Sequence, residues 1–227
     1  MSHPHPQCAV CPYEWSERYC RKAGGKAPEN CPSIRMKETL ARAKSETISE
    51  DLLPFAREAS RQESEGYSGR GQGYASVTPC KPRIQEIIEF ARRMHYKRLG
   101  LAFCVGVRFE AEKVHRLFES AGFEVVSVAC KAGRVPKSEL GLTPAEHVDT
   151  TCEVETMCNP VFQAEAVNDC EVELNVLMGL CVGHDSLFIM HAKAPATVLA
   201  VKDRMLGHNP MAAVYQLDTY YRFLKDI

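Results

Sequence analysis

The chain has 227 residues, and its 28 basic and 29 acidic side chains give a formal net charge of −1. The charges are mixed along the sequence without a basic stripe, so nucleic acid is not an expected partner. The longest apolar runs are strand-sized and no signal-peptide pattern is present, so we expect a cytoplasmic protein without a membrane segment.

Cysteine is the one unusual feature of the composition, with 11 residues. An odd number in a protein expected in the cytosol argues against a disulfide framework, because that compartment keeps thiols reduced. Metal binding and redox chemistry are therefore the leading explanations. Three of the cysteines are interpreted as packing residues, namely Cys80, Cys152 and Cys170.

Residues 1–34 are predicted to form a small cysteine-rich metal-binding lobe. A segment this short cannot bury enough apolar surface to fold alone, so four thiolates around a metal centre would hold it together. The spacing Cys-x2-Cys-x8-Cys-x10-Cys favours an iron–sulfur cluster of the 4Fe-4S type, because zinc ribbons usually present two close pairs; zinc remains the alternative. The expected ligands are Cys8, Cys11, Cys20 and Cys31.

Aromatic residues lie between these cysteines, and Tyr13, Trp15 and Tyr19 are expected to shield the metal centre from solvent. His3 and His5 are not expected to be ligands.

Residues 35–81 are predicted to be a helical segment followed by a glycine-rich linker. Helices are expected near Ile34–Ala43 and Glu50–Ser60, and Ser49 is a candidate cap of the second. Gly66–Thr78 contains four glycines and no periodicity, which is typical of a flexible connection. Its Gly-Arg-Gly-Gln-Gly run is not a phosphate loop, because no strand precedes it and no Gly-Lys-Ser/Thr follows.

Residues 82–227 alternate between helical and strand patterns. This alternation predicts a three-layer α/β/α domain with a mostly parallel, Rossmann-like sheet of about four or five strands. The polar stretch from 131 to 151 is predicted to be irregular. The expected strands are Leu99–Phe103, Phe123–Ala129, Leu174–Leu180 and Thr197–Val201. The expected helices start at Pro82 and Val107, cover Pro160–Asn168 and Ser186–His191, and run from Asn209 toward Leu224.

The tripeptide Cys-Val-Gly occurs at Cys104–Gly106 and again at Cys181–Gly183, each time between a predicted strand and a predicted helix. Backbone N–H groups and the positive helix end would lower the pKa of each thiol. Cys130 follows another strand, and Cys158 precedes a helix. Because ligands bind at the carboxyl ends of parallel strands, these four cysteines are predicted to line one crevice and bind a cofactor there. A second iron–sulfur cluster, a zinc ion or a set of reactive thiols would each fit.

Four other side chains at this edge are candidate catalytic residues. His184 could transfer protons, although a metal ligand or a surface residue fits as well, and Asp185 could be catalytic or cap a helix. Lys202 could bind substrate charge, or pair with Asp203 on the surface.

We therefore predict an iron–sulfur protein with redox or sulfur-transfer chemistry on a small molecule, partnered by that substrate or by a redox partner. One alternative is a non-catalytic zinc-binding, metal-handling or redox-sensing protein. Another is a thiol enzyme whose nucleophile is Cys181 or Cys104. Whether the protein is an enzyme, and its oligomeric state, are left open by the sequence.

Longer motifs resemble those of an uncharacterised cysteine-rich prokaryotic family, the domain of unknown function 1847. The resemblance covers nearly the whole chain, including the leading cysteines, and it implies metal binding without specifying a reaction or a metal. It is carried by Phe103–Gly106, Ala129–Lys131, Cys158–Pro160 with Gln163–Glu165, Gly179–Phe188, Val201–Arg204 and Gly207–Pro210.

Overall fold

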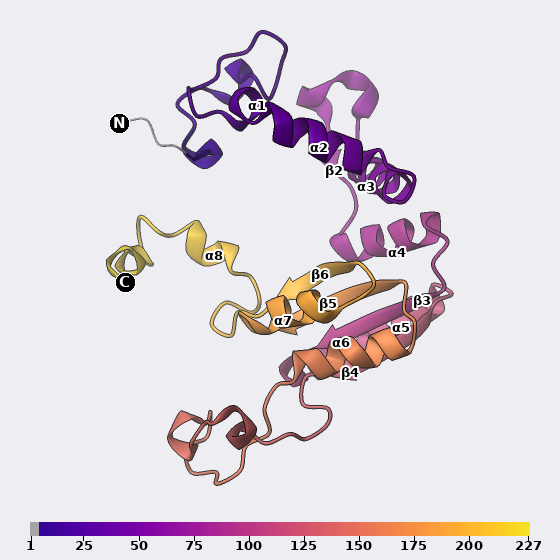
Figure 1. Cartoon of the computed structure of the whole chain (residues 1–227), viewed down its shortest axis with the longest axis vertical. Coiled ribbons are helices and arrows are strands. Elements are labelled where there is room, and N and C mark those ends of the chain that lie inside the picture. Colours follow the sequence, from indigo (N-terminus) through magenta and orange to yellow (C-terminus); the bar gives the residue numbers. More distant parts are fainter. Residues whose placement is uncertain (1–4) are drawn as a thin grey trace. The chain divides into compact units, whose positions relative to one another are not determined.

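The computed structural model describes residues 5–227, and the chain divides after Ser64 into two compact units. Figure 1 colours the first unit indigo to purple and the second from magenta to yellow. His3 lies outside the described residues. Within residues 5–227, no helix is both long and apolar enough to cross a membrane.

The first unit has little apolar core. Of residues 5–64, only Gln62 is buried. The first predicted helix is interrupted at Met36, and Ser49 caps the second as expected, since its Oγ accepts the Leu52 N–H at 3.3 Å. The elements are 3-10 turns η1 (Cys8–Val10) and η2 (Trp15–Glu17) and helices α1 (Pro32–Arg35), α2 (Lys37–Thr47) and α3 (Leu53–Glu65), whose last residue belongs to the second unit.

The second unit contains one main sheet with helices on both faces (Figure 1). Its strands are β1 (Tyr67–Ser68), β2 (Thr78–Pro79), β3 (Arg98–Phe103), β4 (Glu124–Ala129), β5 (Leu174–Leu180) and β6 (Ala196–Val201). Its helices are α4 (Arg83–Arg93), α5 (Arg108–Ser120), α6 (Pro160–Asp169), α7 (His184–His191) and α8 (Met211–Val214). Short 3-10 turns are η3 (Arg70–Gln72), η4 (Tyr74–Ser76), η5 (Val105–Val107), η6 (Lys137–Leu140), η7 (Pro144–Glu146) and η8 (Arg222–Asp226).

The main sheet confirms the predicted α/β fold class. Its four strands are all parallel and lie in the order β4-β3-β5-β6. Side chains alternate between the two faces, so Leu99 and Leu101 pack with Phe118 of α5, whereas Ala102 packs with Phe188 of α7. Helices α4 and α5 therefore cover one face, and α6 and α7 cover the other, which gives three layers.

The strand order creates a topological switch point between β3 and β5. After β3 the chain enters α5 and returns to β4, whereas after β5 it enters α7 and continues to β6 on the opposite side. The two connections leave on opposite faces of the sheet. In open parallel sheets, ligands bind at this position, outside the carboxyl ends of the strands.

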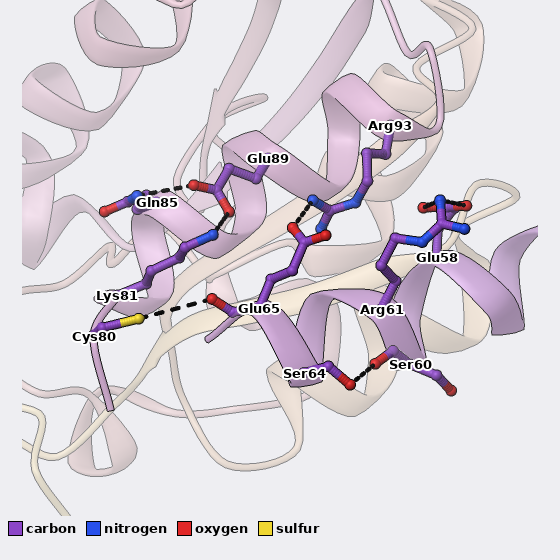
Figure 2. Close-up of polar contacts among 10 residues, drawn as sticks. All are labelled: Glu58, Ser60, Arg61, Ser64, Glu65, Cys80, Lys81, Gln85, Glu89 and Arg93. Carbon is purple, nitrogen blue, oxygen red and sulfur yellow. Dashed lines mark hydrogen bonds and ion pairs between the residues drawn. The ribbon is translucent and has the colours of Figure 1, made fainter. Parts of the chain in front are cut away.

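The segment before the sheet is more ordered than its glycine content predicts. β1 and β2 pair antiparallel, so Gly66–Thr78 is not a structureless linker. Figure 2 shows two ion pairs that join the residues flanking this segment to α4, Glu65–Arg93 at 2.7 Å and Lys81–Glu89 at 2.6 Å. The Cys80 thiol also donates to the Glu65 carbonyl at 3.8 Å.

The interpretation of three cysteines as packing residues is wrong, because Cys80, Cys152 and Cys170 are all exposed.

The predicted last helix is also wrong in length. Regular helix covers only α8, and turns lead from there to η8. The segment between them forms local bonds that compete with a helix, including Thr219 Oγ1 to the Gln216 carboxamide at 2.6 Å. Its large apolar side chains do not pack onto the sheet, since Tyr215 and Tyr220 are exposed. Without a buried face, a helix of this length is marginal.

Candidate functional site

The two Cys-Val-Gly segments flank the switch point, as the sequence predicts. Cys104 comes directly after β3, and its N–H donates to the Met178 carbonyl of β5 at 3.0 Å. Cys181 comes directly after β5, and its carbonyl accepts the His184 N–H at the start of α7 at 2.9 Å. Both cysteines therefore lie where strand hydrogen bonding ends and helical hydrogen bonding begins.

Three of the four cysteines predicted here form a cluster of thiols, which we call the thiol cluster: Cys104, Cys130 and Cys158. The ladder between β3 and β4 continues to Cys130, whose N–H donates to the Phe103 carbonyl at 2.9 Å. The Cys130 carbonyl in turn accepts the Asn159 N–H at 2.8 Å, which brings Cys158 beside it. The Sγ atoms of Cys130 and Cys158 are 3.7 Å apart, and Cys130 also hydrogen-bonds to Cys104.

Backbone N–H groups and a lysine surround the thiol cluster. The Gly106 N–H donates to Cys104 Sγ, and the Val105 N–H to Cys130 Sγ, both at 3.4 Å. A Cβ on Gly106 would lie 3.4 Å from Lys202 Nζ and 3.7 Å from Cys104 Sγ. The ammonium and the thiol therefore approach the same point beside this glycine.

These contacts separate the protonation states of the three thiols. The hydrogen bond from Cys130, assisted by the Gly106 N–H and by Lys202, lowers the pKa of Cys104 to about 4 despite burial. The hydrogen bond between Cys130 and Cys158 also lowers the pKa of Cys158 to about 6, with Lys131 and His184 contributing positive charge. The same two hydrogen bonds, together with burial, raise the pKa of Cys130. These contacts therefore favour the thiolate forms of Cys104 and Cys158 and the protonated form of Cys130, and the three groups titrate together.

The structure gives Cys181 a different partner. Its Sγ accepts a hydrogen bond from Arg204 Nη2 at 3.0 Å, and Cys181 is half-buried. Binding of one metal centre by all four cysteines stays a prediction.

The candidate catalytic residues have separate roles in the structure. Lys202 contacts Cys104, and His184 acts on Cys158 through its charge. Asp185 accepts the Ser186 N–H through Oδ1 at 2.8 Å, at the start of α7. Asp203 Oδ1 accepts the N–H groups of Met205 at 3.1 Å and Leu206 at 2.9 Å, so it stabilises a turn.

The four N-terminal cysteines line one cavity of about 50 Å³ in the first unit: Cys8, Cys11, Cys20 and Cys31. Tyr19 also lines it, whereas Trp15 is 59 % exposed and lies under the Arg21 guanidinium, 5.9 Å from its ring centre. Of the three aromatic residues expected to shield a metal centre, Tyr19 lines this cavity and Tyr13 and Trp15 do not, and the shielding itself stays a prediction.

Neither group of cysteines is already arranged around a metal ion. Among residues 5–227, no three or more His, Cys, Asp or Glu side chains form a group that could hold one. The N-terminal set fits a soft metal by donor type and by its shared cavity, and its sulfur atoms would have to move closer together on binding.

Sequence reasoning gave no role to three residues, of which Gln163 and Lys131 support the thiol cluster and Arg204 contacts Cys181. Gln163 Nε2 donates to the carbonyls of Phe103 at 3.2 Å and Val128 at 2.7 Å, which ties α6 to the ends of β3 and β4. Lys131 and Arg204 supply positive charge to Cys158 and Cys181. Their positions in the sequence could have indicated two of these residues, since Lys131 follows Cys130 directly and Arg204 lies two residues beyond Lys202.

Comparison with known proteins places the chain in a family without assigning it a reaction. A relative in Methanocaldococcus jannaschii, the uncharacterised protein MJ0455, is 44% identical over 135 residues, which cover 60% of this chain and 67% of the relative. The model of a protein family of unknown function, DUF1847, matches residues 31–199, a range that includes the whole thiol cluster. The chain therefore belongs to the DUF1847 family.

Proposed function

We propose that this protein carries out thiol redox or sulfur-transfer chemistry on a small molecule, with Cys104 as its nucleophilic thiolate. The observation that carries the proposal is the thiol cluster at the switch point. Cys104 there contacts a protonated neighbour, Cys130, and approaches the Lys202 ammonium. A thiolate is the nucleophilic form of cysteine, and a hydrogen-bond donor and a cation both favour it.

The chemistry needs both a nucleophile and a proton donor, and the cluster offers both. Cys104 and Cys158 are the thiolates, and the raised pKa of Cys130 keeps its proton available. His184 and Lys202 add positive charge, which would attract an anionic substrate.

The proposal is tested by the pH dependence of alkylation. A thiolate with a low pKa is less nucleophilic than an ordinary thiolate, which offsets much of its larger population, so a single rate is not diagnostic. The dependence of the rate on pH is diagnostic instead. Iodoacetamide should label Cys104 at a nearly constant rate from pH 5.5 to 8. Ordinary thiols should react about tenfold faster for each pH unit in the same range. Labelling of each cysteine is followed by peptide mass spectrometry on the reduced full chain.

Exposed Cys170 is the internal control, because it lies outside the thiol cluster. Replacing Lys202 by Met should move the Cys104 profile to higher pH. A Cys104 that reacts at no pH, or that shares the profile of Cys170, would contradict the proposal.

We also propose a metal centre in the N-terminal lobe, favoured by the cavity that the four cysteines share. The scarcity of buried residues supports it, because residues 5–64 have no apolar core to hold them folded. An iron–sulfur cluster bound there would supply electron transfer, and a zinc ion would supply structural stability.

Anaerobic purification followed by iron, zinc and acid-labile sulfide analysis tests the metal centre. Iron with an equal amount of sulfide is expected for the cluster, and zinc without sulfide for the alternative. The metal should be lost in Cys11→Ser and retained in Cys170→Ser. Wild-type protein purified without stoichiometric metal would argue against the centre.

A further inference from the structure

We infer that Cys130 and Cys158 form a reversible disulfide, and that the substrate oxidising them is a small anionic disulfide attacked by Cys104. This inference rests on the proposed function and names its redox pair and substrate class. It starts from the order of the three sulfur atoms, in which Cys130 contacts both of the others.

The Cys130–Cys158 contact is close to the geometry of a disulfide. Their Sγ atoms are 3.7 Å apart, and a bond needs about 2.0 Å, so a side-chain movement of less than 2 Å would suffice. The hydrogen bond from Asn159 N–H to the Cys130 carbonyl already holds the two backbones together. Cys158 is half-buried at a loop end, and it therefore has more freedom to move than Cys104, which is 9% exposed.

The segment between the two cysteines would not resist the bond. Residues 131–157 leave the sheet and return, as Figure 1 shows for the excursion below β4. Near its base, the Met157 N–H donates to the Val135 carbonyl and the Lys137 N–H to the Glu155 carbonyl, both at 2.8 Å. The ends of the excursion are thus already paired, and a disulfide would close a loop that is closed by hydrogen bonds in the reduced protein.

The reaction can be written with all atoms accounted for. The Cys104 thiolate attacks one sulfur of the substrate R–S–S–R, the S–S bond breaks, and RS⁻ leaves and takes a proton from water. Cys130 then attacks Cys104 Sγ, and the second RSH leaves with the proton of Cys130. Finally the Cys158 thiolate attacks Cys130 Sγ, which forms the Cys130–Cys158 disulfide and releases Cys104 as thiolate. Two electrons pass from the pair to the substrate, and a low-molecular-weight thiol would reduce the pair again.

The charges around the cluster favour an anionic substrate. Lys202 Nζ and Cys104 Sγ lie 3.4 and 3.7 Å from one point beside Gly106, so this ammonium is the main cation at the cluster. His184 and Lys131, which pairs with Glu155 at 3.7 Å, add positive charge at Cys158. Forming the disulfide removes the negative charge of one thiolate beside these cations, so the oxidised pair is readily reduced, as expected for a pair that turns over.

The experiment treats the reduced full chain anaerobically with oxidised glutathione, blocks remaining thiols with iodoacetamide, and digests with trypsin and glutamyl endopeptidase. Cleavage after Glu124, Lys131, Glu155 and Glu165 isolates Cys130 and Cys158 in separate peptides. The expected product is Val125–Lys131 linked to Thr156–Glu165. Cys104→Ser should slow its formation by about tenfold or more, because the attacking thiolate is lost and the substrate can then react only with Cys158 directly, whereas Cys170→Ser should match wild type.

Cys158→Ser keeps the inference falsifiable if the buried Cys130 cannot be replaced without unfolding. That variant should stop at a Cys104–Cys130 disulfide. Glutathione remaining on Cys104 of the wild type, with Cys130 and Cys158 unlinked, would overturn the inference but leave the nucleophilic role of Cys104 intact. If glutathione reacts with exposed cysteines and never with Cys104, the proposed function fails as well.

Discussion

The two cysteine groups of this chain lie in different packing environments. In the second unit, a core that includes Leu99, Phe118 and Phe188 packs against the sheet, and the thiol cluster lies at the margin of this core, with Cys104 and Cys130 buried in it. In the first unit, only Gln62 is buried, and the four cysteines line a cavity with no such core beneath it. Thiols on a packed scaffold can be tuned for reactivity, whereas thiols without one are better suited to holding the chain together.

Removing the proposed N-terminal metal is the change with the largest expected effect on this comparison. A chelator, or Cys11→Ser, is expected to unfold the N-terminal lobe, because structural zinc in small domains contributes about 10–16 kcal/mol of folding free energy. Limited proteolysis would then cut within residues 5–34, while the α/β unit stays intact. Cys170→Ser is the control, and a lobe that keeps its protease resistance would contradict the expectation.

Deleting a core side chain tests the other half of the comparison, the packed α/β unit. Phe118 is fully buried, so Phe118→Ala should lower the free energy of unfolding of the α/β unit by about 3–5 kcal/mol. Trp15→Ala removes an aromatic that is 59 % exposed, and the loss should be within about 0.5 kcal/mol. Urea unfolding followed by circular dichroism measures both, and equal losses would mean that the two units do not differ in this way.

Acid should weaken the contribution of Cys104 to stability. The pKa of Cys104 is lowered to about 4 in the folded chain, so its contribution is complete above the ordinary thiol value near 8.5 and is lost as the pH falls toward 4. The difference in unfolding free energy between wild type and Cys104→Ser should therefore shrink from pH 8 to pH 5, by at most about 1.4 kcal/mol per unit. Urea titrations at three pH values give this difference, and a constant value would show that Cys104 is not a thiolate.

The smallest effect is expected at Arg204. Its contact with Cys181 is at an exposed position, where a charge interaction contributes about 0–1 kcal/mol. Arg204→Met should change the alkylation rate of Cys181 by no more than about fivefold, and should leave the pH profile of Cys104 unchanged. A shift of the Cys104 profile would mean that the Cys181 contact and the thiol cluster act as one site.

Periodicity predicted the sheet well because its two central strands, β3 and β5, are buried by their neighbours. The strand Leu174–Leu180 has the predicted bounds, and β3 starts one residue earlier than expected. The last helix was mispredicted because its apolar residues are exposed and so do not reflect a buried face.

The strand ends could place Cys104, Cys130 and Cys181 at one edge, but not assign their contacts. Cys158 reaches Cys130 through the irregular excursion 131–157, where no repeating pattern indicates a path. The pairing of Cys181 with Arg204 depends on side-chain direction, which strand position does not determine.

The hydrogen-bonded base of the excursion 131–157 also makes its tip a suitable place to insert another domain. Because Val135 and Met157 are joined by a backbone hydrogen bond, and Lys137 and Glu155 by another, the tip between them can change in length without moving the ends. A fluorescent domain inserted at exposed Gly141 would lie within the loop that joins Cys130 to Cys158. Formation and reduction of the proposed Cys130–Cys158 disulfide could then be followed by fluorescence in a living cell.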